Sequence, residues 1–484
     1  MLLYVNAISN AIIYTIAILL IKGGLFLAKD MTTGNPVKLI LYFSIPLLIG
    51  NIFQQFYSMV DTIIVGRFLG VNSLAALGAT GAMMFLIIGF ATGLTSGFSV
   101  IVAQFFGAND INGLKKSVAT SIILSIVSTI VITIISMLSI HPLLSLMNTP
   151  ADIMYEAKSY ISIIFAGTAA TVFYNMISSI LRALGDSKTP LYFLILSSIL
   201  NVILDLVFIL NFSMGVAGAA YATVISQGVA GLLCLLYAIK KYEILRLKKQ
   251  HFKMDKVLIY KNLKIGLPMA FQFSITAIGV MVLQSSINAF GSVIVAAHTA
   301  ASKVEQVVMQ PAITFGVTMA TYSAQNLGAG KIDRIKEGVK KCSMISLIVS
   351  IISGVVVVLF GDSFTRLFIN GAESDVIRYS QQYLNTVSVF FTVLGLLFIY
   401  RNTLQGIGDA FVPMMAGAAE LIARVVVAFT LPMLIGYAGI CFASPIAWIA
   451  ATIPLGIAYF KRINNMLYNK NNFNISTESE SIVS

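Results

Sequence analysis

The chain has 484 residues, of which 58% are hydrophobic and only 10% are charged, and its mean hydropathy is +0.91. This composition is far more apolar than that of an average soluble domain, so it excludes that class and indicates a membrane protein. The formal charge of +12 does not indicate nucleic-acid binding. The basic residues stand in short connections beside apolar segments, and no compact basic domain is present to contact a duplex.

The first apolar segment, residues 1–28, has no basic residue before it and Lys22 and Lys29 behind it. This order of charge is the reverse of a secretory signal. Three interpretations remain open: an additional helix with an outer N-terminus, an interfacial helix, or an extension ahead of a true start at Met31. The polar stretch that begins at Met31 favours the third, so we treat residues 1–30 as a hydrophobic N-terminal extension.

From Val37 onward the chain contains apolar segments that are long enough to cross a bilayer, and in lipid such segments form helices. Twelve are expected, at residues 38–66, 72–105, 116–140, 153–182, 189–211, 216–239, 257–289, 293–326, 337–360, 376–404, 411–434 and 439–461. The connections on one side are rich in lysine and arginine. This bias predicts that the N-terminus of the first helix and the C-terminus are cytoplasmic, in a multi-pass protein of the plasma (inner) membrane.

The two halves of the chain repeat three short motifs at offsets of 221 to 223 residues. These are Ile45-Pro46 with Leu267-Pro268, Ala103-Gln104-x-x-Gly107-Ala108 with Ala324-Gln325-x-x-Gly328-Ala329, and Gly185-Asp186 with Gly408-Asp409. Six helices in each half give both copies the same orientation. The expected fold class is therefore all-α, with two six-helix bundles related by a pseudo-two-fold axis along the membrane normal, and transport by rocking of one bundle against the other.

The repeat also predicts the domain organisation. We expect a first lobe at residues 31–240, a basic cytoplasmic linker at 241–256, a second lobe at 257–463 and a disordered polar tail at 464–484. The Gly-Asp motifs are interpreted as a helix stop followed by a helix cap, without chemistry of their own.

One apolar segment, residues 189–211, contains the carboxylate Asp205. Placing a carboxylate inside a membrane costs so much free energy that Asp205 is expected to have a function. Asn201 lies one helical turn earlier, on the same face. Thr223 on the next segment is expected at a similar depth, and Asp61 late in the first segment reaches the same layer if Pro46 or helix tilt lowers it. These four residues predict a site for a shared proton or for Na⁺. The alternative is an Asp that only joins helices by hydrogen bonds.

The second half does not repeat this cluster and has charges of its own. Glu420 and Arg424 are spaced for an ion pair on one helix, which either is structural or lines a substrate cavity. Lys303 and Glu305 are expected to be buried in the eighth segment. Glu305 is a candidate for attracting a cationic substrate or for binding a proton, with a packing role as the alternative.

Gln54, Gln55 and Tyr57 share the first segment with Asp61 and are candidate cavity residues, and ordinary helix packing is the alternative. The sequence contains no nucleotide-binding glycine loop, metal-spaced cluster or nucleophile elbow, so we expect no enzyme activity. No cofactor is expected beyond H⁺ or Na⁺ as a coupling ion. The three cysteines show no metal or redox spacing.

Residues 31–462 resemble the multidrug and toxic compound extrusion (MATE) family. The motifs that carry the resemblance are Ile45-Pro46, Gln54-Gln55-x-Tyr57-x-x-Val60-Asp61-Thr62, Val65-Gly66-Arg67, both Ala-Gln-x-x-Gly-Ala copies, Arg182-Ala183-Leu184-Gly185-Asp186 and Asn201-x-x-x-Asp205. The resemblance implies a V-shaped transporter of two six-helix bundles that exports cationic amphiphiles in exchange for H⁺ or Na⁺. It implies a first-lobe cation site at Asp61, Asn201, Asp205 and Thr223.

The chain departs from the family pattern in two places. One branch of the family uses acids on the seventh and tenth helices, whereas here segment 257–289 has none and the tenth helix has only Asp375 at its mouth. The extension at residues 1–28 is also unusual. We expect a monomer that contacts membrane lipids and small cationic or amphiphilic substrates, and the alternative functions are a flippase for a lipid-linked oligosaccharide or other lipid and a membrane sensor.

Overall fold

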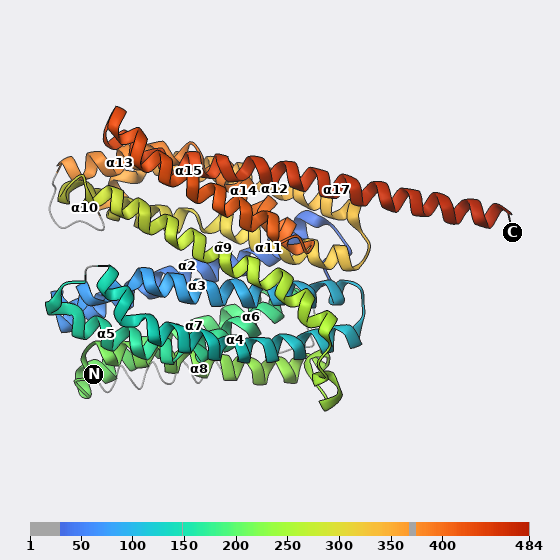
Figure 1. The fold of residues 1–484 in the computed structure, drawn as a ribbon, viewed down its shortest axis with the longest axis horizontal. Helices are drawn as coiled ribbons and strands as arrows, with labels where there is room; N and C mark the ends of the chain where they lie inside the picture. Colours follow the sequence, from blue (N-terminus) through green and yellow to red (C-terminus); the bar gives the residue numbers. More distant parts are fainter. Residues whose placement is uncertain (1–29, 148, 367–373, 484) are drawn as a thin grey trace. The chain divides into compact units, whose positions relative to one another are not determined.

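The computed structural model describes residues 30–147, 149–366 and 374–483, and Figure 1 shows their fold. The described residues are almost entirely helical and contain no strand, which confirms the predicted all-α class. The expectations for residues 1–28 lie outside the described residues.

The described helices follow the twelve predicted segments, and several of the segments are broken into two pieces. They are α2 (Pro36–Leu69), α3 (Val71–Gly107), α4 (Ile111–Leu146), α5 (Ala151–Ala166) with α6 (Thr168–Ala183), α7 (Lys188–Leu206) with the π-helical turn η1 (Val207–Asn211), α8 (Gly215–Lys241), α9 (Lys256–Asn288), α10 (Ser292–Val308) with α11 (Gln310–Gly328), α12 (Ile332–Arg366), α13 (Ser374–Ser388) with α14 (Phe391–Gly406), α15 (Phe411–Ile435), and α16 (Tyr437–Cys441) with α17 (Ala443–Val483). Two short 3-10 helices, η2 (Glu243–Leu245) and η3 (Lys249–Phe252), lie between α8 and α9.

Nine helical spans in the described ranges are long and apolar enough to cross a membrane. The pairs α5 with α6 and α13 with α14 bend by 47° and 52° at their breaks, and counting each pair as one span gives eleven. The remaining predicted segment is α10 with α11, which breaks at Met309. Pro311 stands in the first turn of α11, where its missing N–H breaks no helical hydrogen bond.

The C-terminal segment, predicted as a disordered polar tail, contains the end of the last helix. Helix α17 continues to Val483 and so runs through most of residues 464–484. Lys470 Nζ contacts Asp333 Oδ2 of α12 at 2.6 Å, which ties the helix to its own unit. A polar composition predicts disorder because it buries little apolar area, but extending a helix that is already formed avoids the cost of nucleation.

The chain forms two compact units, each with its own helical bundle. The first contains Asp30, Ile49–Val102 and Asp110–Leu263, and the second contains Met31–Leu48, Ala103–Asn109 and the chain from Lys264 onward. The units therefore differ from the predicted lobes at helix ends. The start of α2 and the end of α3 belong to the second unit, and the first two turns of α9 belong to the first.

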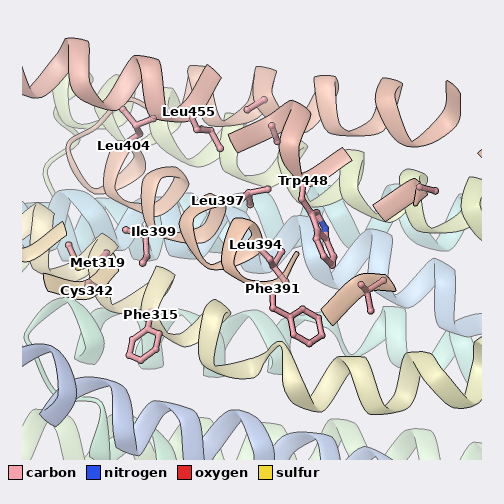
Figure 2. Packing of buried hydrophobic residues seen from close by; sticks show 14 of the residues in the cluster. Phe315, Met319, Cys342, Phe391, Leu394, Leu397, Ile399, Leu404, Trp448 and Leu455 are labelled. Carbon is pink, nitrogen blue, oxygen red and sulfur yellow. The ribbon is translucent and has the colours of Figure 1, made fainter. Parts of the chain in front are cut away.

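Each unit has its own core. In the first unit α8 packs against α5, α6 and α7, and in the second unit α11 packs against α14 and α15 packs against α17. Figure 2 shows the second core, which includes Phe315, Met319, Cys342, Phe391, Leu394, Trp448 and Leu455. In a bilayer such contacts stabilise the bundle mainly by close packing, because lipid tails are as apolar as the side chains.

The two Gly-Asp motifs end α6 and α14 in the same way. Gly185 and Gly408 have φ values of +80° and +89°, a region that glycine enters without strain. The N–H groups of Asp186 and Asp409 each donate to the carbonyl five residues earlier, at 2.9 Å. Asp186 then accepts from the N–H of Thr189 at 2.9 Å and caps α7. The helix-stop interpretation is confirmed.

Candidate functional site

Helix α7 brings the predicted amide and carboxylate to the centre of the first unit. Asn201 and Asp205 lie one turn apart and are both completely buried. Directly after Asp205 the helix widens into the π-helical turn η1. Such turns are rare and are concentrated at functional sites, because they redirect side chains within an otherwise regular helix.

Asn201 links Asp205 to the neighbouring helix α8. With its amide oriented to satisfy both neighbours, Asn201 donates to Asp205 Oδ2 at 3.0 Å and accepts from the N–H of Thr223 at 3.1 Å. The Thr223 hydroxyl donates to the carbonyl of Ala219 at 3.0 Å, which leaves its lone pairs directed at the cluster.

Asp61 on α2 completes the predicted group of four. Its carboxyl group and that of Asp205 lie within hydrogen-bonding reach of each other. The Oδ1 atom of each carboxyl is buried without a partner among the described residues. Two carboxylates in contact repel each other when both are ionised, so such a pair favours a shared proton or a bound positive ion. The structure therefore brings together Asp61, Asn201, Asp205 and Thr223.

Two tyrosines surround the carboxyl pair. Tyr57, one turn before Asp61 on α2, makes a side-chain hydrogen bond with Thr223. Tyr160 of α5 is 4% exposed and close enough to interact electrostatically with Asp61 and Asp205. We predicted Tyr57 as a cavity residue and did not single out Tyr160. The sequence signal available for Tyr160 was a polar hydroxyl in an apolar segment of the same half.

The remaining first-unit candidates lie on more accessible surface. Gln54 is exposed and Gln55 is partly exposed, on the same helix as Asp61. Their exposure is compatible with a cavity wall, and they stay candidates for that role.

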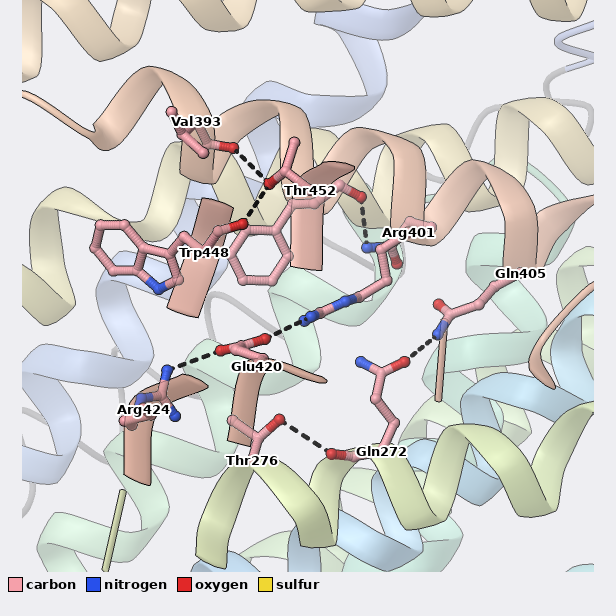
Figure 3. A network of polar contacts seen from close by, with 11 residues as sticks. Gln272, Thr276, Val393, Arg401, Gln405, Glu420, Arg424, Trp448 and Thr452 are labelled. Carbon is pink, nitrogen blue, oxygen red and sulfur yellow. Dashed lines mark hydrogen bonds and ion pairs between the residues drawn. The ribbon is translucent and has the colours of Figure 1, made fainter. Parts of the chain in front are cut away.

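The predicted pair of Glu420 and Arg424 is one half of a larger cluster in the second unit. Glu420 Oε1 accepts from Arg424 Nη2 at 2.8 Å, and Glu420 Oε2 accepts from Arg401 Nη2 of α14 at 2.7 Å. Figure 3 shows this cluster, and it also shows a separate hydrogen bond from Gln405 of α14 to Gln272 of α9 at 2.7 Å. Arg401 was not predicted from the sequence, because its partner Glu420 stands on the following helix and no helical spacing connects the two residues.

Glu305 is buried in the same unit. It is 8% exposed and accepts a hydrogen bond from the Tyr383 hydroxyl at 2.9 Å. The ring of His298 meets the ring of Tyr383 edge to face, with centroids 4.7 Å apart. Lys303, expected to be buried, is instead exposed. A shift of two positions turns a side chain to another face of a helix, which explains the difference from Glu305.

A comparison with known families decides the identity of the fold. The MatE family model matches residues 46–207 and again residues 268–430. The chain belongs to the MatE family. The two matches begin at the corresponding prolines of the predicted repeat, so they also confirm that the MATE fold of this chain is built from two copies.

Relatives and solved structures agree with this assignment. The chain is 31% identical over 385 residues to "Probable multidrug resistance protein YpnP" of Bacillus subtilis, an alignment that covers 79% of this chain and 85% of the relative. A structure described as the outward-facing conformation of a multidrug resistance MATE family transporter matches with a TM-score of 0.85 and 25% identity, over 92% of this chain and 100% of that one. A Pyrococcus furiosus transporter, described as having a binding pocket of reverse polarity that suggests a different function, matches with a TM-score of 0.85 and 26% identity, over 90% and 98%.

MATE proteins are multi-pass membrane transporters that act in efflux, and this chain is one of them. The expectation that it is not an enzyme is confirmed by the family. Among the described residues no group of three or more His, Cys, Asp or Glu side chains could hold a metal ion. A cation at the Asp61–Asp205 pair would depend on hydroxyl, phenol and amide oxygens for its other contacts, a set suited to H⁺ or to a hard ion such as Na⁺.

Proposed function

We propose that this MATE protein is a secondary antiporter that exports cationic amphiphilic drugs or toxic compounds in exchange for H⁺ or Na⁺. The observation that carries the proposal is the contact between the carboxyl groups of Asp61 and Asp205 within apolar helices. A buried acidic pair of this kind is expensive unless it binds a positive ion as part of its function. The first unit therefore holds the cation site in this proposal.

Helix α2 is the element that connects the site to the rest of the protein. It carries Asp61 in the first unit and begins in the second, and Pro46 removes one backbone hydrogen bond from the part of the helix that belongs to the second unit. Uptake of H⁺ or Na⁺ from outside removes the repulsion between the carboxylates and favours the conformation in which the pair is closed. Movement of α2 and rocking of the lobes then release the substrate outward.

The orientation of the protein in the membrane is proposed from the connections that are rich in lysine and arginine. We propose that the protein resides in the plasma (inner) membrane as a monomer, with the N-terminus of α2 and the C-terminus in the cytoplasm. Gln54, Gln55 and Tyr57 belong to the substrate path of the first unit. Glu305, Glu420 and Arg424 belong to that of the second.

The test is transport by purified protein in liposomes, with ethidium as substrate and an imposed pH or Na⁺ gradient. Asp205→Asn keeps the shape of the side chain and removes its charge, so gradient-driven efflux should fall to the level of empty liposomes. Asp152→Asn, at the exposed start of α5, is the matched control and should transport as the unmodified protein does. Normal efflux by the Asp205→Asn protein would refute the proposed coupling site. Comparing the two gradients identifies the coupling ion.

A further inference from the structure

The charges buried around Glu420 do not balance. Arg401 and Arg424 both donate to this single carboxylate, and the three side chains are 5 to 6% exposed. The cluster therefore carries one positive charge more than Glu420 neutralises. A buried site screens that charge poorly, so the excess needs a compensating negative group.

Each guanidinium also keeps an unused donor. The Nε atoms of Arg401 and Arg424 are buried and have no hydrogen-bond partner among the described residues. A guanidinium presents its N–H groups as a rigid fork that matches the oxygens of carboxylate and phosphate. Leaving a buried charged donor unpaired is costly, and an anionic oxygen would satisfy both the spare donors and the spare charge.

The backbone of α9 leaves space for the guanidinium of Arg424. A Cβ atom on Gly279 of α9 would lie 2.6 Å from Arg424 Nη1, so the glycine leaves the space that the guanidinium occupies. Figure 3 also shows Gln272 of α9 and Gln405 of α14, whose amide groups form a separate hydrogen bond at 2.7 Å.

Glu305 of α10 is a further buried acid of the second unit. Among the described residues of the second unit, the buried charged side chains are Glu305, Arg401, Glu420 and Arg424. Arg424 is close enough for its charge to act on Glu305, which Tyr383 holds by a hydrogen bond. The four charges sum to zero when Glu305 is ionised, so an ionised Glu305 competes with a bound anion for the arginine pair.

We propose that Arg401 and Arg424 recognise an anionic group of a transported molecule, either a carboxylate or a phosphate, in competition with the charge of Glu305. The inference rests on the proposed transport function and names a substrate class that the acidic site of the first unit does not attract. Molecules that carry an anionic group, including zwitterions, become substrates. Binding itself requires no transport, so the two proposals can fail separately.

The chain carries its own probe for this site. Trp448 is the single tryptophan of the sequence, is 4% exposed and lies beside the Glu420 network in Figure 3. It stands on α17, which packs against α15, the helix of Glu420 and Arg424. The tryptophan fluorescence of the full-length protein in nanodiscs, excited at a wavelength that tyrosine hardly absorbs, therefore reports on this part of the second unit.

The experiment titrates sodium phosphate and, separately, sodium acetate at constant ionic strength set with sodium chloride. We expect a saturable change in Trp448 fluorescence in at least one of the two titrations, and the arm that responds identifies the preferred anion. Loss of one charge-assisted contact in Arg424→Gln or Arg401→Gln should weaken binding by at least about tenfold. Glu305→Gln should strengthen it several-fold, because the competing charge is removed.

Lys303→Gln is the matched control, since it removes a positive charge from the same helix as Glu305 at an exposed position. It should leave the titration unchanged. If an arginine variant does not fold, the opposite effect of Glu305→Gln still decides the question. The anion site is refuted if phosphate and acetate change the Trp448 fluorescence no more than chloride does. It is also refuted if Lys303→Gln weakens anion binding as much as the arginine variants do. Ethidium efflux that persists in either case leaves the proposed antiport intact.

Discussion

Gly107 and Gln325 are in backbone contact: a Cβ atom on Gly107 would lie 1.9 Å from the carbonyl oxygen of Gln325. The contact is reciprocal, because a Cβ atom on Gly328 would lie 1.9 Å from the carbonyl oxygen of Gln104. These residues occupy corresponding positions of the two Ala-Gln-x-x-Gly-Ala copies. The repeated motif therefore packs against itself within the second unit, at a distance that only glycine permits.

We predict that Gly107→Ala and Gly328→Ala each destabilise this packing by about 2 kcal/mol or more, because the obstructing atom is backbone and cannot rotate away. Ethidium efflux should fall in both variants. Thermal unfolding of the purified proteins, measured together with efflux in liposomes, checks the prediction.

Gly81 provides the matched control within α3. It is helical and a Cβ atom there meets no heavy atom within 4 Å, so Gly81→Ala should be neutral or slightly stabilising, by up to about 1 kcal/mol. Equal losses at Gly81 and Gly107 would contradict the packing explanation, because helix propensity favours alanine over glycine and the added Cβ atom at Gly81 meets no neighbour.

The repeat was visible in the sequence, whereas the contact between its copies was not. Fixed offsets reveal related motifs, but they do not say which motifs meet. For the same reason the sequence assigned all of α2 and α3 to the first lobe, and the structure places Met31–Leu48 and Ala103–Asn109 in the second unit. Chain order is a poor guide where a long helix passes from one compact unit to another.

The acidic cluster was predictable because a membrane restricts where polar residues stand. Helical rise and segment direction placed Asp205 and Thr223 at one depth, and Asp61 reached the same layer on the condition that Pro46 or helix tilt lowered it. Tyr160 and Arg401 escaped prediction because each meets its partners on other helices, without a sequence spacing to mark the contact. Side-chain direction was also uncertain, as the exposed Lys303 shows.

The Glu420 cluster supports a stability prediction. Glu420→Gln removes the negative charge between Arg401 and Arg424, and the two guanidiniums are then buried with an uncompensated charge. Breaking a buried ion pair in this way should cost about 3 kcal/mol or more. Thermal unfolding in detergent measures it. The control is Asp375→Asn, whose pair with Arg378 is exposed on both sides and should contribute almost nothing; equal losses would contradict the proposed importance of burial.

Asp186 supports a prediction about pH. Burial alone would raise the pKa of Asp186, but the charge of Lys241 and the hydrogen bonds from Thr189 and Tyr242 outweigh burial and hold the pKa below its usual value. The Lys241 Nζ lies 3.0 Å from Asp186 Oδ2. Since the folded pKa is depressed, the stabilisation is fully present above the unfolded value of about 3.9 and is lost as pH falls through the folded value.

Asp186→Asn should therefore lower stability by about 2 kcal/mol at pH 7, and the difference from the unmodified protein should shrink below about pH 4. Thermal unfolding of both proteins across this range is the measurement. Asp409→Asn, in the second copy, is the comparison: its partner Arg462 is 54% exposed, so the loss should be smaller. A difference at Asp186 that does not change with pH would contradict the ion-pair explanation.

The contact between Asp61 and Asp205 makes a prediction about how their substitutions combine. If the two carboxyl groups hold one shared cation, either Asp61→Asn or Asp205→Asn alone removes the site. Each single variant should lose gradient-driven ethidium efflux, and the double variant should be no worse than either. Efflux rates in liposomes under the same gradient measure this. The two acids would instead act at separate sites if each single variant retains part of the efflux rate and the fractional losses multiply in the double variant.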